Sequence, residues 1–176
     1  MNTDLNDLLV DTFERVRTAT RRAVEGLDTA ALTFRLDGEA NTIAWLVWHI
    51  ARIQDDHIAG LHADEQAPAE QVWNTGWYER FAVPFDRSDT GYGHSSDDVA
   101  AVRAGAADLL GYFDAVHEAT VAYVQRISAG DLDRVVDRTW DPPVTLGVRL
   151  VSVAADNLQH AGQAAFIRGL ALRSSS

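Results

Sequence analysis

The sequence predicts an all-α fold, a four-helix bundle with a long aromatic-rich connection between its second and third helices. Apolar residues recur near the helical period in four long segments, and capping residues bound these segments. The content of 47% hydrophobic and 23% charged residues is ordinary for a globular protein. The 176 residues are expected to form a single domain, residues 1–176, with a buried core.

The first two helices are predicted at residues 3–26 and 41–61. Thr3 is a candidate N-cap of the first helix, since a hydroxyl oxygen there accepts a hydrogen bond from a free backbone N–H. Asn41 or Thr42 is expected to cap the second helix in the same way. The apolar face of this second helix consists of Ile43, Leu46, Val47, Ile50 and Ile53.

The last two helices are predicted at residues 96–129 and 145–168. Ser95 or Ser96 caps the third helix, and glycines directly after both helices are expected to end them, at positions 130 and 169. Residues 131–144 read as an extended turn region. Four such helices with one long crossover are typical of a four-helix bundle, in which facing side chains can build a metal site.

The connection at residues 63–95 is too long to be a plain loop in a compact domain. We expect one or two short helical turns in it, near residues 69–73 and 77–81. The tryptophans of these turns are expected to form a hydrophobic lid over one end of the bundle. The aromatic residues of the connection are Trp73, Trp77, Tyr78, Phe81, Phe85 and Tyr92.

Composition excludes several classes of function. A formal net charge of -11 argues against binding to nucleic acid and to anionic membranes. The absence of cysteine excludes disulfides and a cysteine nucleophile, and the absence of lysine excludes Schiff-base chemistry. With no signal peptide and no apolar stretch of about 20 residues, a cytoplasmic location is expected.

Three residues on two predicted helices form a candidate metal site. Asp156 and His160 are four residues apart, a spacing that places two side chains about 6 Å from each other on one helical face. His49 offers a third ligand from the second helix. A lone histidine such as His49 is more often a core residue, and an acid and a histidine at the spacing of Asp156 and His160 more often form a surface contact. Together, the three residues favour a divalent metal. Two imidazoles and one carboxylate suit zinc or non-haem iron, and they leave a position open for water or a substrate atom.

Other polar and aromatic residues are candidates for an adjoining pocket. Trp45 and Arg52 flank His49 on the same helix, and Arg52 could bind an acidic substrate group, although most arginines are solvated. Asp56 lies on nearly the same stripe as His49, at a cavity or on a solvated face. Gln163 is one turn past His160, where it could contact a substrate or a ligand.

The other histidines are not expected to bind the same ion. His57 is rotated away from His49 on the helical wheel. His62, His94 and His117 are expected on the surface.

Two helical segments carry a resemblance to a known family. Residues 43–56 (IAWLVWHIARIQDD) resemble helix two of the DinB-like metal-binding four-helix bundles, and residues 156–163 (DNLQHAGQ) resemble their last helix. Residues 72–77 and 89–94 look like an actinobacterial branch. The resemblance covers nearly the whole chain and implies an up-down-down-up, DinB/YfiT-like bundle with three ligands to a divalent metal, zinc or nickel.

The resemblance also has implications for chemistry. The usual family pattern has a histidine where this chain has Asp156. The related mycothiol-dependent maleylpyruvate isomerases similarly place an acid four residues before the final histidine. Asp156 then binds the metal directly or through a water. Characterised relatives imply a homodimer that uses a thiol such as mycothiol or bacillithiol.

Two hypotheses about function follow. The first is an enzyme, a metal-dependent thiol S-transferase or isomerase that takes a small-molecule thiol and an electrophile. The second is a non-catalytic helical bundle that either binds a metal or small ligand or acts as a stress-related protein. The absence of an evident general acid or base favours this second hypothesis. Metal analysis and an assay with mycothiol distinguish them.

Overall fold

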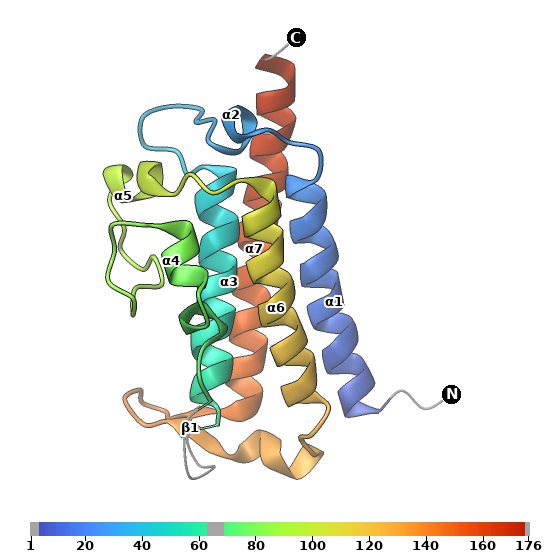
Figure 1. Cartoon of the computed structure of the whole chain (residues 1–176). Helices are drawn as coiled ribbons and strands as arrows, with labels where there is room; N and C mark the ends of the chain where they lie inside the picture. The colour runs from blue at the N-terminus through green and yellow to red at the C-terminus, as the bar shows by residue number, and fades with distance from the viewer. Residues whose placement is uncertain (1–3, 63–68, 175–176) are drawn as a thin grey trace.

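Four long helices make up the bundle. They are resolved in a computed structural model that describes residues 4–62 and 69–174. The predicted all-α fold is confirmed. Figure 1 shows α1 and α7 running toward the end where the C-terminus lies, while α3 and α6 run the opposite way. The four helices are α1 (Leu5–Val24), α3 (Ile43–Gly60), α6 (Ala106–Val124) and α7 (Leu146–Ser174).

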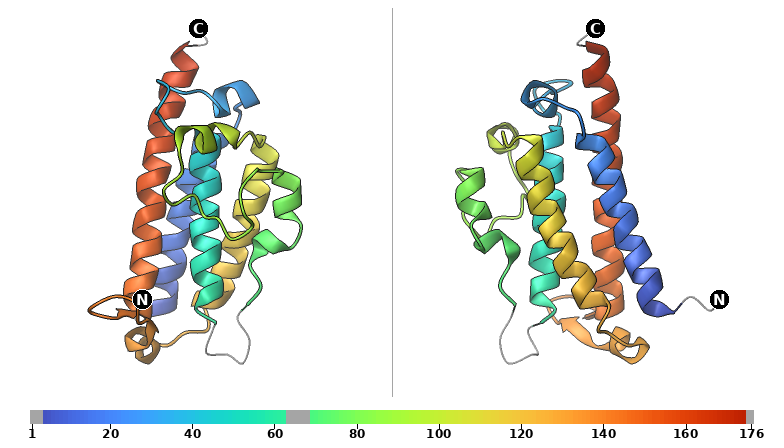
Figure 2. Two further views of the ribbon diagram at one scale, coloured as in Figure 1. Left: turned by 90° about the vertical axis from the view of Figure 1, so that its left-hand side faces the viewer. Right: turned by 45° about the vertical axis from the view of Figure 1, so that its right-hand side comes forward.

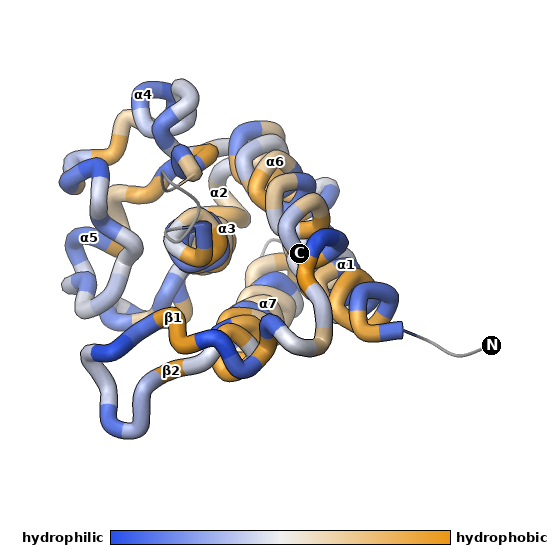
Figure 3. Tube along the Cα trace, turned by 90° about the horizontal axis from the view of Figure 1, so that it is seen from below, coloured by the Kyte–Doolittle hydropathy of each residue, from blue (hydrophilic) through white to orange (hydrophobic). Residues whose placement is uncertain are grey.

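Helix α3 is enclosed on nearly all sides. Seen along the bundle, it lies between α6 and α7, and the long connection covers its outer face (Figure 3). Every residue from Ile43 to Ala51 is buried, because this stretch is apolar around the whole helix rather than along one stripe. A histidine in the middle of this stretch, His49, is therefore held away from bulk water.

The ends of the first two long helices follow from their caps. Asp4 caps α1 by accepting a hydrogen bond from the backbone N–H of Asp7 at 2.9 Å. The predicted cap, Thr3, lies outside the described residues. The prediction of a cap at Thr42 is confirmed, since its hydroxyl oxygen accepts from the backbone N–H of Trp45 at 3.0 Å. This bond fixes the start of α3 about two turns before His49.

The prediction of a single helix over residues 96–129 is wrong. The structure has α5 (Ser96–Ala101) and then α6, which ends at Val124. The chain leaves the helical conformation at Val102 (ψ 104°), whose side chain is fully buried, and Gly105 begins the next helix. The break lets the chain turn from the connection into the bundle axis. After α6, Ser128 caps the short helix η2 (Ala129–Asp133).

Helix α7 continues past its predicted end. Gly169 does not stop it, because Ile167 and Ala171 are buried where α7 packs against the unpredicted short helix α2 (Thr29–Leu32). The extended region before α7 contains β1 (Val135–Asp137) paired antiparallel with β2 (Val144–Thr145). In the described part of the chain, no helix combines the length and apolarity needed to cross a membrane.

The aromatic connection packs along the side of the bundle. It contains η1 (Val72–Asn74) and α4 (Trp77–Phe81), so the two predicted turns are confirmed. Figure 2 shows it lying against α3 rather than over an end of the bundle, which corrects the expected position of the lid. Trp73 is buried against Trp48 and Tyr112, with ring centroids 6.2 and 5.1 Å away. Residues 63–68 of the predicted connection lie outside the described residues.

A buried ion pair on α3 holds the connection in place. The carboxylate of Asp55 accepts hydrogen bonds from the backbone N–H groups of Val72 (2.9 Å) and Trp73 (2.7 Å) and from the hydroxyl of Tyr112 (2.8 Å). Burial raises the pKa of Asp55, and these hydrogen bonds oppose the rise. Its partner Arg52, 3.6 Å away, is wholly buried.

The burial of Arg52 corrects its expected place at a pocket. Its guanidinium donates to the carbonyl oxygen of Asp89 and to the side-chain oxygen of Gln71, both at 3.0 Å. Two distant parts of the connection are thereby tied to the turn of α3 that follows His49.

Candidate metal centre

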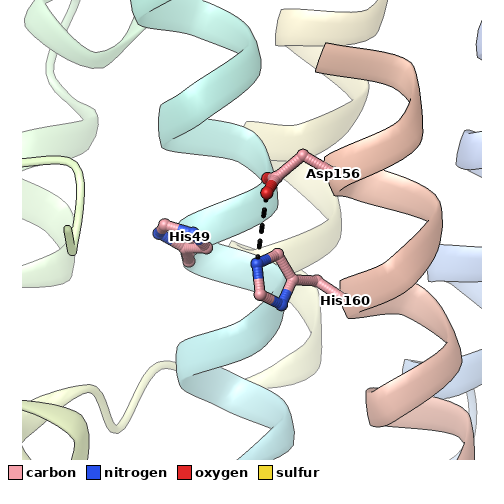
Figure 4. A group of neighbouring side chains, drawn as sticks. All are labelled: His49, Asp156 and His160. Carbon is pink, nitrogen blue, oxygen red and sulfur yellow. Dashed lines mark ion pairs between the residues drawn. The ribbon is translucent and has the colours of Figure 1, made fainter. Parts of the chain in front are cut away.

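The three predicted ligands lie together between α3 and α7. His49 projects from the middle of α3 toward Asp156 and His160, which project from successive turns of α7 (Figure 4). One ligand atom from each residue lies within 4.8 Å of the other two. The imidazole rings of His49 and His160 are nearly perpendicular, at 82°, with centroids 4.8 Å apart.

The ring of His49 is fixed in orientation by its neighbours. Its Nδ1 lies 2.6 Å from the carbonyl oxygen of Thr90, and because a carbonyl oxygen only accepts, Nδ1 carries the proton. The indole of Trp45 stacks on the ring, 4.8 Å between centroids and 7° from parallel. The lone pair of Nε2 is left free, which is the usual arrangement of a metal-binding histidine.

The pair on α7 also has an arrangement that fits a cation. Nε2 of His160 lies 3.5 Å from Oδ1 of Asp156, and its Nδ1 lies 3.3 Å from the side-chain oxygen of Gln163. Gln163, a candidate for the pocket, thus contacts a candidate ligand. The other carboxylate oxygen of Asp156, Oδ2, is buried and has no hydrogen-bond partner among the described residues. A buried carboxylate oxygen without a partner is costly, and a bound cation would satisfy it.

The charge states of the three groups also suit a divalent ion. Burial lowers the pKa of His49, so its imidazole is neutral near pH 7. The hydrogen bond between His160 and Asp156 raises the pKa of the imidazole and lowers that of the carboxylate. Two imidazole nitrogens and a carboxylate oxygen match the ligands of zinc and its first-row neighbours, and an ion here would replace the proton that His160 shares with Asp156.

The end of the connection supports His49 from the outside. The indole N–H of Trp45 donates to Nδ1 of His94 at 3.0 Å, and Nε2 of His94 lies 3.1 Å from Oδ1 of Asp89. The side chain of His94 is only 5% exposed, so its predicted surface position is wrong. Sequence reasoning missed this support, and the available signal was the pair of glycines at Gly91 and Gly93.

Gly91 lies directly against His49. Its φ of +93° is a conformation that side-chain-bearing residues avoid, and an added Cβ would be 2.8 Å from Nδ1 of His49. Gly91→Ala is therefore expected to displace the ring and lower zinc affinity by about 10–100-fold, the effect of losing an outer contact to a ligand. The matched control is Gly93→Ala, whose φ is +75° but whose added Cβ meets nothing within 4 Å. Equal zinc affinities for the two variants, measured by competition with a chelator, would contradict this role.

The remaining candidates lie outside the cluster. His117 is buried, not on the surface as predicted, because its Nε2 is bonded to Glu14 at 2.9 Å between α6 and α1. His62 is partly buried, with its ring 4.8 Å from that of Tyr123. Asp56 lines a hollow further along α3 and accepts a hydrogen bond from Gln71 at 2.8 Å.

Comparisons with known proteins agree with this architecture. A family model described as the DinB superfamily matches residues 12–164. The crystal structure of a conserved protein from Enterococcus faecalis is similar, with a TM-score of 0.87 and 28% sequence identity. The similarity covers 97% of this chain and 99% of that chain. Among curated proteins, none matches this chain.

Proposed function

This chain belongs to the DinB superfamily, and from that membership we propose that it binds a divalent metal, zinc or nickel, and acts as a metal-dependent thiol S-transferase or isomerase. The observation that carries the proposal is the group of His49, Asp156 and His160, with a buried carboxylate oxygen for which the described residues provide no hydrogen-bond donor. Three protein ligands leave part of an ion's coordination free, as in catalytic rather than structural sites. The thiol is a small molecule, because the chain has no cysteine.

When bound, a divalent ion supplies a coordination position that lowers the pKa of a thiol and holds it as a nucleophile. The protein's residues would supply orientation. The carbonyl of Thr90 and the ring of Trp45 hold His49, and Gln163 holds His160, so the two imidazoles keep a fixed mutual angle. A fixed orientation of this kind limits the rearrangement that the ligands need in order to meet the ion. The buried side of the site on α3 excludes water from the reacting sulfur.

The activity is tested by incubating zinc-loaded or nickel-loaded protein with mycothiol and a panel of electrophiles, and following loss of free thiol. We expect a rate above that of the metal-free protein, and we expect this excess to disappear in a variant that lacks His160. Metal binding without any excess rate across the panel would instead favour a non-catalytic metal-binding or stress-related bundle.

A further inference from the structure

Two hollows lead away from the metal centre along α3 and α7. The nearer, of about 260 Å³, is bounded by Asp156, and the farther, of about 300 Å³, is bounded by Arg149. His57 lines both, so its side chain lies at the boundary between the two hollows. Arg149, Ser152 and Asp156 lie on one stripe of α7, at spacings of three and four residues. A ligand that occupies both hollows would pass over the ring of His57, and this route from Asp156 toward β1 is the path.

The two ends of this path differ in chemistry. Beside Asp156, the walls include the apolar side chains of Ile53 and Val153. At the far end, the same hollow is lined by Arg149 and by two carboxylates, those of Asp56 and of Asp137, which pairs with Arg149. An elongated ligand would thus meet apolar side chains along the middle of the path and both positive and negative side chains at its far end.

The guanidinium of Arg149, at the far end, uses only part of its hydrogen-bonding capacity. Nη2 of Arg149 donates to Oδ2 of Asp137 at 2.7 Å, and Asp137 is held by Thr139 through its other oxygen. Nη1 of Arg149 lies 3.4 Å from both ring nitrogens of His57, so it rests against the imidazole and meets no carboxylate among the described residues. One side of the guanidinium is therefore available to an acceptor.

The carboxylate of Asp56 also uses only part of its hydrogen-bonding capacity. Oδ1 of Asp56 accepts a hydrogen bond from the side-chain nitrogen of Gln71 at 2.8 Å. Oδ2 lies 3.9 Å from Nδ1 of His57, too far for a hydrogen bond, and no described residue donates to it. The side chain of Asp56 is 39% exposed, so this oxygen can be reached by a ligand.

We propose that this path binds an elongated ligand that carries an α-amino-acid group, with the carboxylate on Arg149 and the ammonium on Asp56. A ligand with only an anionic group would be repelled by Asp56, and one with only a cationic group would leave the free side of Arg149 without an acceptor. A zwitterionic group satisfies both charges. Its apolar chain packs between Ile53 and Val153.

The length of the path sets the length of the ligand. Arg149 and Asp156 are seven residues apart on α7, which corresponds to about 10 Å along the helix. The other end of the ligand then lies at the metal centre. This placement rests on the proposed function and identifies the ligand as the electrophile, while the recognition of the α-amino-acid group requires neither metal nor thiol.

The test compares three probes that share one chain length. Metal-free protein is titrated calorimetrically with L-norleucine, with n-hexanoate, which lacks the ammonium, and with n-pentylamine, which lacks the carboxylate. We expect norleucine to bind at least about tenfold more tightly than either analogue, since each analogue lacks one of the two charge-assisted interactions. Equal affinities for the three probes, or no binding of norleucine, would overturn the proposal.

Two variants locate the binding. Arg149→Met and Asp56→Asn are each expected to reduce norleucine affinity to that of the analogues, whereas Arg103→Met, an exposed arginine outside both hollows, leaves it unchanged. Norleucine binding that requires zinc and is insensitive to both substitutions would show chelation by the ion and would contradict the proposal. Because the probes carry no thiol, failure of this binding and failure of the thiol-dependent activity are separate results.

Discussion

Replacing His160 with alanine is expected to remove most of the divalent metal that the wild-type protein retains. The remaining His49 and Asp156 would offer two ligands on different helices, and Oδ1 of Asp156 would lose its imidazole neighbour. The loss of affinity should exceed the roughly 10–100-fold that follows removal of an outer partner of a ligand. Metal analysis of protein purified without an affinity tag measures this directly.

The same substitution should abolish the thermal stabilisation that added metal gives. A metal ion whose free concentration is 100 times its Kd stabilises a folded protein by about 2.7 kcal/mol. Added zinc should therefore raise the melting temperature of the wild type and not that of His160→Ala. The matched control is His62→Ala, which removes a histidine at the end of α3, outside the cluster. Equal zinc-induced shifts in all three proteins would contradict binding at the cluster.

Replacing Asp55 with alanine is expected to destabilise the fold by about 3–5 kcal/mol, because removing one partner of a buried ion pair leaves the other charge uncompensated. Arg52 is that partner, and it is wholly buried. Two backbone N–H groups at the start of η1 and the hydroxyl of Tyr112 also lose their acceptor. The free energy of unfolding is measured by urea denaturation.

A neighbouring acid provides the comparison. Asp56→Ala removes one hydrogen bond to Gln71 from a side chain that is 39% exposed, and it should cost about 1 kcal/mol or less. Similar unfolding free energies for the Asp55 and Asp56 variants would show that the buried pair does not anchor the connection. Asp55→Asn, which keeps the shape of the side chain, should be destabilised less than Asp55→Ala.

The three residues of the candidate metal centre could be predicted from the sequence because they stand out against a helical pattern. Asp156 and His160 are one turn apart, and His49 interrupts an otherwise apolar stretch, so each residue stands out against its neighbours. The bundle was equally accessible, since four long periodic segments allow few other folds. The pairing of the two segments in space was expected from the predicted bundle, in which facing helices project side chains inward, and from the resemblance.

The residues that support the candidate metal centre could not be predicted from the sequence. Thr90 contributes a backbone carbonyl oxygen, which every residue type possesses, so no side chain marks its role. Arg52 and His94 belong to residue types that are usually exposed, and only the folding of the connection over α3 buries them. The break at Val102 has the same origin, since burial of its side chain outweighs helical propensity.

The most direct test is a crystal structure of the zinc-loaded protein with anomalous data collected at the zinc edge. We expect one ion within about 2.0–2.2 Å of Nε2 of His49, Nε2 of His160 and a carboxylate oxygen of Asp156, with at least one position taken by solvent. A water between Asp156 and the ion would still place the ion in this cluster. An ion bound elsewhere, or an ion here that His49 does not contact, would contradict the proposed metal centre.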